Sequence, residues 1–587
     1  MSKLSRRDFL RASAASFGTL VVSSVLTGCS LDDPNPRIQT TTADTGPTGQ
    51  FLHGVASGDP LHDKVILWTR ATPDDETLSS VEVIWEVSQD EGFESIITSG
   101  STQAVSASDF TVKIDLQGLD AGAVYYYRFG AFGKISPVGR TKTLPDVDVD
   151  KVSLAMVSCS NYPAGHFNVY HALGQRTDID AILHLGDYIY EYGMGGYGTE
   201  NAEAMGRALP EDNNGEIISL VDYRKRYGLY RLDGGLQAAH LSAPFIAVWD
   251  DHEVANDAHR DGAQNHNDGE GSYEARKMAA LQAYFEWMPI RPASIDDNET
   301  IYRQFDFGQL VSLYMLDTRL IGRDAGLDYG QFIDPQTGAL DIAGFQAAVG
   351  SPTRTMLGLE QLQWLQGSMQ YSQATWQVLG QQVLMGRMML PAELLPHLAN
   401  PGPQVFTLLQ ELAAIKQRIK LNDPTLTAQE IARVETVAPY NLDAWDGYFV
   451  EREVVLGTAR ALGKNLVVLA GDTHNSWASN LTDMNGNAVG VEFATASVTS
   501  PGLAEALGLN SLTAGAFEDI VRLLVDPLKY FNVTDRGYNV MTFTADDAIS
   551  QWHYVDNIAS SDYQMNTARG HGLRMRAGHP QLTWVNP

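Results

Sequence analysis

Cysteine is scarce in this sequence: the 587 residues contain two, Cys29 and Cys159. Two cysteines allow at most one disulfide, so the fold cannot depend on a disulfide framework. Basic residues are also scarce, 41 against 71 acidic ones, which gives a formal net charge of −30. A field of that sign repels polyanions. We therefore expect no nucleic-acid-binding surface on this protein.

Two common catalytic devices are missing as well. No Gly-rich phosphate loop and no Gly-x-Ser-x-Gly nucleophile elbow appears where such a device is expected, so a serine hydrolase is disfavoured. The composition itself, 44% hydrophobic with 10 Trp and 24 Tyr, is typical of a well-packed globular protein. The length is too great for one typical core and predicts two domains.

The first thirty residues form an export signal. Residues 5 to 11 contain paired arginines followed by Phe and Leu, and an apolar, small-residue run extends from Ala12 to Gly28. That run is too short and too rich in Ser and Gly for a permanent transmembrane helix. It ends in Leu-Thr-Gly-Cys29, which resembles the lipobox of bacterial lipoproteins and implies cleavage before Cys29 and lipidation of its thiol.

These features predict export by the twin-arginine route and a lipid-anchored protein that faces the periplasm or the cell surface. If Cys29 carries lipid, Cys159 has no disulfide partner and needs another reason to persist in an oxidising compartment. Residues 30–49 are rich in Asp, Pro, Thr and Gly and predict a flexible tether between the anchor and the body of the protein.

Residues 50–145 predict a small all-β domain. Short β-branched and aromatic runs separated by turn residues predict strands at residues 64–69, 81–87, 111–116 and 123–129, which is the spacing of an antiparallel sandwich. The segment from Leu119 to Arg128 resembles the tyrosine corner of fibronectin-III-like domains. Pro145 cannot donate to a sheet ladder, so we place the domain boundary there. The domain contains no catalytic constellation.

Residues 150–587 predict a larger α/β domain. Apolar strands that end in polar loops are expected at residues 152–157, 181–185, 245–249, 310–316, 378–384 and 466–469. Helices are expected at residues 169–173, 276–286, 359–369 and 406–421. The helix-prone stretch at residues 391–445 indicates an insertion that overhangs a site. Ligands of layered α/β folds bind beyond the carboxyl ends of strands.

Metal-capable side chains concentrate at four of these strand ends. Cys159 follows the first strand, Asp187 and Tyr190 follow the second, and later loops contain Trp-Asp-Asp251-His252-Glu and Gly-Asp472-Thr-His474. Adjacent parallel strands bring such loops together, which a multinuclear metal site requires. Thiolate and phenolate are anionic donors suited to a transition metal such as ferric iron, whereas calcium prefers Asp or Asn oxygens.

Five ordered motifs resemble those of PhoD-type alkaline phosphatases and phosphodiesterases, which are relatives of the purple acid phosphatases. The motifs are Ser158-Cys159-Ser160-Asn161, Gly186-Asp187-Tyr188-Ile189-Tyr190-Glu191, the segment from Trp249 to Asp257, Leu316-Asp317-Thr318-Arg319 and Gly471-Asp472-Thr473-His474. The resemblance covers nearly the whole chain after the signal. It implies a layered metallophosphoesterase-type β-sandwich flanked by helices and preceded by a smaller all-β fibronectin-III/Ig-like domain.

The resemblance also implies a ferric iron with accompanying calcium ions, although other divalent metals are not excluded. The implied metal ligands are Cys159, Asp187, Tyr190, Asp251, Asn256, Asp472 and His474, with Asp187 as the bridge. Asp251 and Asn256 are alternatives for calcium. His252 resembles the residue that contacts phosphate and protonates the leaving group, and Arg319 is expected to hold a phosphoryl oxygen.

We therefore expect a monomeric, exported phosphoesterase in which a metal-bound hydroxide attacks phosphorus. Its substrate is a small or polymeric phosphate ester, and the choice between monoesters and diesters stays open. The alternative is a non-enzymatic surface lipoprotein that binds a polyanionic or glycan ligand and has a structural metal site.

Overall fold

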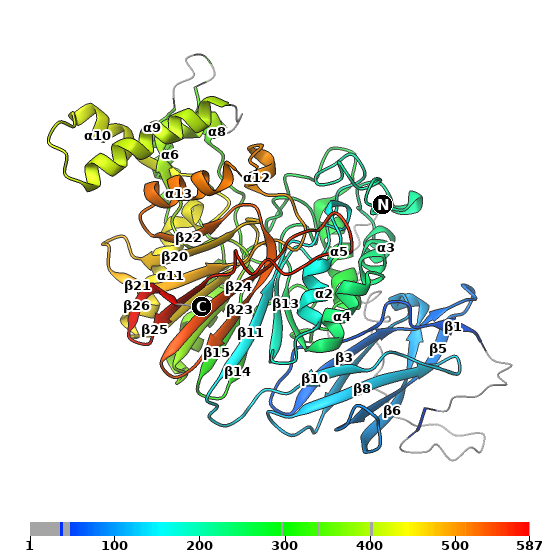
Figure 1. The fold of residues 1–587 in the computed structure, drawn as a ribbon. Helices are drawn as coiled ribbons and strands as arrows, with labels where there is room; N and C mark the ends of the chain where they lie inside the picture. Colours follow the sequence, from blue (N-terminus) through cyan, green and yellow to red (C-terminus); the bar gives the residue numbers. More distant parts are fainter. Residues whose placement is uncertain are drawn as a thin grey trace.

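The computed structural model describes residues 36–38, 47–294, 297–334, 336, 340–398, 403–510 and 512–585. The predicted signal at residues 1–29, with Cys29, and most of the predicted tether lie outside the described residues. Within the described ranges, no helix is both long enough and apolar enough to cross a bilayer. The described strands form three large sheets of ten, seven and five strands, together with helices, so the predicted α/β class is confirmed (Figure 1).

The N-terminal part of the chain is all-β, as predicted. Its main strands are β2 (Val55–Gly58), β3 (Lys64–Arg70), β5 (Ser80–Ser88), β6 (Ile96–Val105), β7 (Thr111–Gln117), β8 (Val124–Ala131) and β10 (Gly139–Lys142). Short strands β1 (Gly49–Gln50), β4 (Thr72–Pro73) and β9 (Lys134–Ile135) complete this part. All four predicted strands are confirmed. The five-stranded sheet packs through a shared apolar core against β2, β3 and β7.

The segment predicted to resemble a tyrosine corner contains a tyrosine whose hydroxyl bonds to the backbone upstream. The hydroxyl of Tyr125 in β8 accepts a hydrogen bond from the backbone N–H of Asp120 at 2.9 Å. The ring itself is 1% exposed. This contact fixes the turn that leads into β8 while the ring fills the core of the sandwich.

The two parts of the chain share one sheet. The ten-stranded sheet has the order β26-β25-β24-β23-β11-β12-β13-β2-β3-β7, so three N-terminal strands extend the larger sheet. The junction is the parallel pairing of Gly58 in β2 with Phe245 in β13 (Phe245–Val248). A Cβ at Gly58 would lie 2.2 Å from the carbonyl oxygen of Pro289, so only glycine permits this close approach. The boundary at residue 145 therefore does not separate two sheets.

Parallel strands β11 (Val152–Val157), β12 (Ala181–Leu185) and β13 form the middle of the large sheet. Its C-terminal end is antiparallel and contains β23 (Arg536–Phe543), β24 (Asp547–Val555), β25 (Gly572–Arg576) and β26 (His579–Val585). The seven-stranded sheet contains β14 (Arg303–Phe307), β15 (Val311–Met315), β16 (Trp376–Gly380), β19 (Asn465–Ala470), β20 (Ser476–Thr482), β21 (Ala488–Ala494) and β22 (Leu528–Asn532). Buried side chains of both sheets share one core.

The predicted strands of the larger part are confirmed to within a residue or two at each end, with one exception. The run at residues 378–384 was expected to be one strand, but β16 ends at Gly380. Just beyond this end, the Gln382 side chain donates to the carbonyl oxygens of Trp249 and Leu316. Val383 and Leu384 are buried, but they pack in the second apolar core instead of in the sheet.

Helices cover both sheets (Figure 1). Beside the parallel strands of the large sheet lie α2 (Asn168–Gly174), α3 (Leu220–Arg231), α4 (Gly234–Ser242) and α5 (Tyr273–Trp287). The second core involves α7 (Gly358–Tyr371), α11 (Phe449–Ala461), α12 (Leu503–Ala506) and α13 (Ala514–Leu524). The stretch predicted as an insertion contains α8 (Leu395–Leu398), α9 (Pro403–Lys420) and α10 (Ala428–Glu435), and α6 (Ile342–Val349) precedes it. Short strands β17 (Met389–Pro391) and β18 (Val437–Pro439) pair at its base.

Candidate active site

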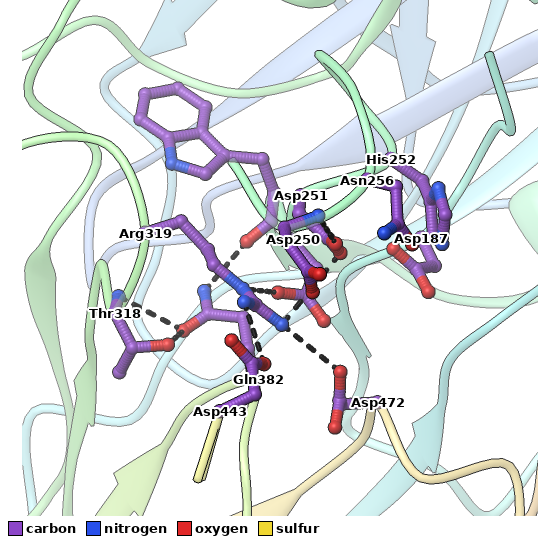
Figure 2. Close-up of polar contacts among 12 residues, drawn as sticks. Asp187, Asp250, Asp251, His252, Asn256, Thr318, Arg319, Gln382, Asp443 and Asp472 are labelled. Atoms are coloured by element: carbon purple, nitrogen blue, oxygen red, sulfur yellow. Dashed lines mark hydrogen bonds and ion pairs between the residues drawn. The ribbon is translucent and has the colours of Figure 1, made fainter. Parts of the chain in front are cut away.

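Four strand-end loops meet at one place, between the two sheets. Cys159 follows β11, Asp187 follows β12, Asp251 and His252 follow β13, and Asp472 follows β19. The first three strands are parallel neighbours, so their carboxyl ends lie side by side. The loop after β19 reaches the same place from the other sheet, and Figure 2 shows Asp187, Asp251, His252 and Asp472 within one cluster.

The backbone at this place is strained. Cys159, Asp187, Asp472 and His474 have φ values of 60°, 57°, 61° and 62°, in the left-handed region that non-glycine residues seldom adopt. Such residues cluster at functional sites because the surrounding fold must hold them there. Gly186 has a φ of 100°, and a Cβ at this position would lie 2.4 Å from the Cβ of Asp250. The loops therefore approach too closely for any other residue.

The predicted ligands of a transition metal come together. Ligand atoms of Cys159, Asp187 and His474 all lie within 4.8 Å of one another. The hydroxyl of Tyr190 lies 2.9 Å from Oδ2 of Asp187 and 3.2 Å from Nε2 of His474. Nδ1 of His474 lies 2.6 Å from the carbonyl oxygen of Pro501, which requires a proton on Nδ1. The Nε2 lone pair therefore faces the cluster, as metal ligation needs.

Two further groups of possible ligands adjoin the first. Asp187, Asp251 and His252 form one, and Asp250, Asp251 and Asp472 form the other. Asp187 belongs to two groups, which is the position expected of a bridging carboxylate. Its Oδ1 is buried and has no hydrogen-bond partner among the described residues. A buried carboxylate oxygen without a partner is costly, so it fits a cation at this point.

The charges of the cluster are also consistent with cation binding. Burial raises the pKa of the Cys159 thiol well above its ordinary value, and the charge of Asp187 raises it further. Burial and neighbouring carboxylates raise the pKa of Asp472 to about 8, against the opposing effect of Arg319. Burial opposes ionisation of Asp187 too, but His252, His474 and Tyr190 outweigh it and lower its pKa to about 2. A bound cation stabilises the anionic form of each of these ligands.

His252 lies against the carboxylate of Glu191, a residue that belongs to one of the five motifs but received no predicted role. Nδ1 of His252 lies 2.7 Å from Oε2 of Glu191, which is fully buried. Glu191 also accepts hydrogen bonds from the backbone N–H of Asn256 and the side chain of Asn265, both at 2.8 Å. The imidazole packs over the Tyr190 ring with centroids 4.2 Å apart. Glu191 thus holds the ring through Nδ1 and leaves Nε2 for other contacts.

Burial disfavours the charged imidazole of His252. The carboxylates of Asp251, Glu191 and Asp187 nevertheless raise its pKa well above the ordinary value. This arrangement favours a protonated ring, which suits a general acid.

Glu253, the residue after His252, joins two of the loops. Its carboxylate accepts from the backbone N–H groups of Asp187 at 3.0 Å, Tyr188 at 2.5 Å and Asp250 at 2.7 Å. The side chain is fully buried. The position of Glu253 inside a site motif is a signal that the sequence already contains. Its backbone partners Asp187 and Tyr188 lie about 65 residues upstream, so only the fold reveals them.

Arg319 lies in the site, but its guanidinium faces carboxylates (Figure 2). It contacts Asp250 at 2.5 Å, Asp443 at 2.8 Å and Asp472 at 3.0 Å, and Asp251 lies 3.7 Å away. The side chain is 1% exposed. The predicted contact with a phosphoryl oxygen therefore stays a prediction, and the observed contacts are those of a cation that neutralises clustered carboxylates. Asp443, at the end of the helical insertion, was missed because no local pattern links it to the site.

A pocket of about 320 Å³ opens over the cluster. His252, His474 and Asn256 lie in its wall, and Tyr440 and Asn441 reach it from the end of the helical insertion. The side-chain amide of Asn256 donates to Gln264 at 3.0 Å, and its predicted role as a calcium ligand stays a prediction. The pocket has aromatic and amide groups in its wall, and its described lining contains no Lys or Arg.

Comparisons with known proteins agree with this geometry. The family model described as PhoD-like phosphatase matches residues 154–552, and the model of the N-terminal domain of PhoD-like phosphatases matches residues 38–145. The chain is 34% identical over 466 residues to alkaline phosphatase D of Bacillus subtilis (strain 168), an alignment that covers 77% of this chain and 70% of the relative. A solved structure titled "Structure of PhoD" matches with a TM-score of 0.73 and 31% identity over 93% of this chain and 94% of that chain.

These matches favour an enzyme over the non-enzymatic alternative. They cover both the all-β part and the part that contains the ligand cluster. The chain therefore belongs to the PhoD-like phosphatase family and is a phosphoester hydrolase.

Proposed function

We propose that this protein is an exported, metal-dependent phosphoesterase that acts on phosphomonoesters, phosphodiesters or both at the Asp187 cluster. The observation that carries the proposal is the position of Asp187, which two groups of possible metal ligands share beneath an open pocket. Phosphoryl transfer needs positive charge around the phosphoryl oxygens. The described pocket wall supplies no Lys or Arg for that purpose, so cations held by the cluster are the source.

The donor chemistry supports iron and calcium. Cys159, Asp187, Tyr190, Asp472 and His474 would hold a ferric ion, because thiolate, phenolate and imidazole suit a transition metal. Asp187 and Asp251 would hold calcium, with Asn256 as the alternative amide ligand, because this cation prefers oxygen. When bound, the cations would activate water and neutralise charge on the phosphoryl group.

The protein's own contribution is orientation and proton transfer. Glu191 accepts a hydrogen bond from Nδ1–H of His252. Despite burial, the carboxylates of Asp251, Glu191 and Asp187 raise the pKa of His252 and favour the doubly protonated ring, so Nε2 also carries a proton at the pocket wall. We propose that this Nε2 proton passes to the leaving oxygen of the ester. A protonated nitrogen cannot ligate a cation, so this role excludes His252 from the ligand set. Arg319 balances the charge of Asp250 and Asp472 beneath the pocket.

The test uses natively exported protein, elemental analysis and two chromogenic substrates, p-nitrophenyl phosphate and bis-p-nitrophenyl phosphate. We expect bound iron and calcium, visible absorption from thiolate or phenolate charge transfer, and loss of both metals and activity in Asp187→Asn. His252→Ala should retain its metals but lose about 10²- to 10⁴-fold in kcat. Asp212→Asn and His62→Ala, on exposed side chains, are the matched controls.

Two outcomes would contradict the proposal. Full turnover after exhaustive metal removal would exclude metal dependence. Loss of metal from His252→Ala would make His252 a ligand and remove it as the general acid.

The remaining parts of the proposal concern location and architecture. The twin-arginine segment and the lipobox-like Cys29 support export and a lipid anchor that faces the periplasm or the cell surface, and we propose a monomer. We also propose that the paired sheets are a metallophosphoesterase-type core, and that the all-β part is fibronectin-III-like, a view supported by the Tyr125 contact. Mass spectrometry of the mature N-terminus would detect or exclude lipid on Cys29.

A further inference from the structure

Residues of strands β24 to β26 line a second cavity. These strands form the C-terminal end of the large sheet (Figure 1). The segment after β24 crosses to α2, where Asn168 donates to the carbonyl oxygen of Asn557 at 2.8 Å. The hollow between this segment, α2 and the strands has a volume of about 780 Å³, against about 320 Å³ for the active-site pocket. Within the described residues, the two cavities share no lining residue.

Aromatic rings that are fixed in place line this cavity. The Tyr563 hydroxyl lies 2.8 Å from Nδ1 of His171 in α2, which ties the tyrosine to the helix. Trp584 in β26 is 52% exposed, yet it packs against His571, with ring centroids 5.7 Å apart, and against Tyr530 at 6.2 Å. An exposed indole held by its neighbours is a ready platform for the apolar face of a ligand, because little conformational entropy is lost on binding.

Polar groups that lack a partner line the same cavity. The side-chain amides of Gln175, Gln551 and Asn566 contribute to the lining; Gln175 and Gln551 are exposed to solvent, Asn566 is half-buried, and none is tied to a protein partner among the described residues. Nε2 of His553 is buried and likewise lacks a partner in this part of the chain. A primary amide offers both donors and an acceptor, so it pairs with hydroxyl groups, which also do both.

The cavity offers almost no free charge. Arg176 is the charged residue of the described lining, and its guanidinium is held by Asp178 at 3.0 and 2.7 Å. Burial and the nearby Arg176 lower the pKa of His553 to about 4, so this ring is neutral at pH 7. An anionic phosphate ester would find neither an unpaired cation nor a metal-ligand cluster here. A neutral ligand rich in hydroxyl groups would find partners for both its apolar and its polar faces.

We propose that this cavity is a binding site for a neutral oligosaccharide, with Trp584 and Tyr563 as stacking platforms and the amides of Gln551 and Asn566 as hydroxyl partners. The site is independent of the phosphoesterase chemistry, since it uses none of the cluster residues. Its role would be to hold the enzyme on a polysaccharide surface or to select substrates that contain sugar.

The experiment titrates the full-length mature protein with maltohexaose, cellohexaose and chitohexaose and follows Trp fluorescence and heat of binding. We expect saturable binding of at least one of them. Trp584→Ala should weaken it by about tenfold or more, which corresponds to roughly 1.4 kcal/mol, and Gln551→Ala should weaken it as well. Tyr371→Ala removes a ring that is 80% exposed elsewhere and should leave binding unchanged.

Turnover of bis-p-nitrophenyl phosphate should be equal in the wild type and all three variants, which shows that each is folded. Absence of binding by all three sugars at millimolar concentration would overturn the proposal. So would binding that Trp584→Ala and Gln551→Ala leave unchanged. Binding of adenosine, lost in Trp584→Ala while no sugar binds, would assign the cavity to nucleosides and overturn the proposal as well.

Discussion

Replacement of Arg319 tests whether its contacts are structural. In Arg319→Met, the carboxylates of Asp250, Asp443 and Asp472 lose a cation that contacts each of them at 3.0 Å or less. The Arg319 side chain that makes these contacts is 1% exposed. Removal of one partner from a buried ion pair costs about 3–5 kcal/mol, because the remaining charge stays buried and unpaired. Asp443 keeps its pair with Arg323, so this cost comes from Asp250 and Asp472. We expect a loss of stability of that size in chelator-treated protein.

The assay is urea denaturation followed by Trp fluorescence, together with kinetics on the metal-loaded enzyme. Arg319→Lys should recover part of the stability, because an ammonium retains the charge but not the planar fork that reaches several carboxylates. Arg260→Met is the matched control: this side chain is 43% exposed and pairs with Asp261 and Asp324, so we expect a change below about 0.5 kcal/mol. Unchanged stability of Arg319→Met, with a raised KM and normal metal content, would refute the structural role. It would instead support the predicted contact of Arg319 with a phosphoryl oxygen.

Three further predictions follow from buried groups. Glu191→Gln should lower kcat by about 10- to 100-fold at unchanged metal content, because His252 loses the carboxylate that orients it; equal kcat would contradict this. Glu253→Gln should lower the free energy of unfolding by about 1–3 kcal/mol in urea titrations, since an NH₂ group would face a backbone N–H; an unchanged urea midpoint would exclude the loop-joining role. Burial and the charges of Arg70 and Arg231 lower the pKa of His53 to about 3 from 6.5. Between about pH 6.5 and 3, His53 is protonated in the unfolded chain but not in the folded protein. The free energy of unfolding should therefore fall as the pH drops from about 6.5 towards 3. His53→Gln should make urea midpoints less dependent on pH over this range.

The loops of the candidate site combine strained backbone with possible metal ligands. Four ligand candidates lie in the left-handed region, directly after strands or within the next few residues. A left-handed residue turns the chain sharply, so a side chain that would otherwise continue beside the sheet points across to the neighbouring loop. The carboxylate of Glu253, bonded to three backbone N–H groups, holds two of these loops together.

The sequence by itself determined the class of structure and the types of side chain at the candidate site. Apolar runs located the strands, and the polar residues at their ends identified Cys159, Asp187, Asp472 and His474, because strand periodicity and donor type are local properties. The resemblance supplied the family, which the comparisons confirm. The early end of β16 could not be predicted, because the residues that follow it make contacts between segments far apart in the sequence, such as those of the Gln382 side chain with Trp249 and Leu316.

Only the tertiary structure decided which charges meet. The partners of Arg319 lie 69, 124 and 153 residues away in the sequence, and no local pattern encodes such proximity. The same holds for Glu191 beneath His252 and for the N-terminal strands that extend the ten-stranded sheet through Gly58. The physical reason is that ion pairs and strand pairing depend on distances in the folded chain, whereas secondary structure depends largely on residues that are neighbours in the sequence.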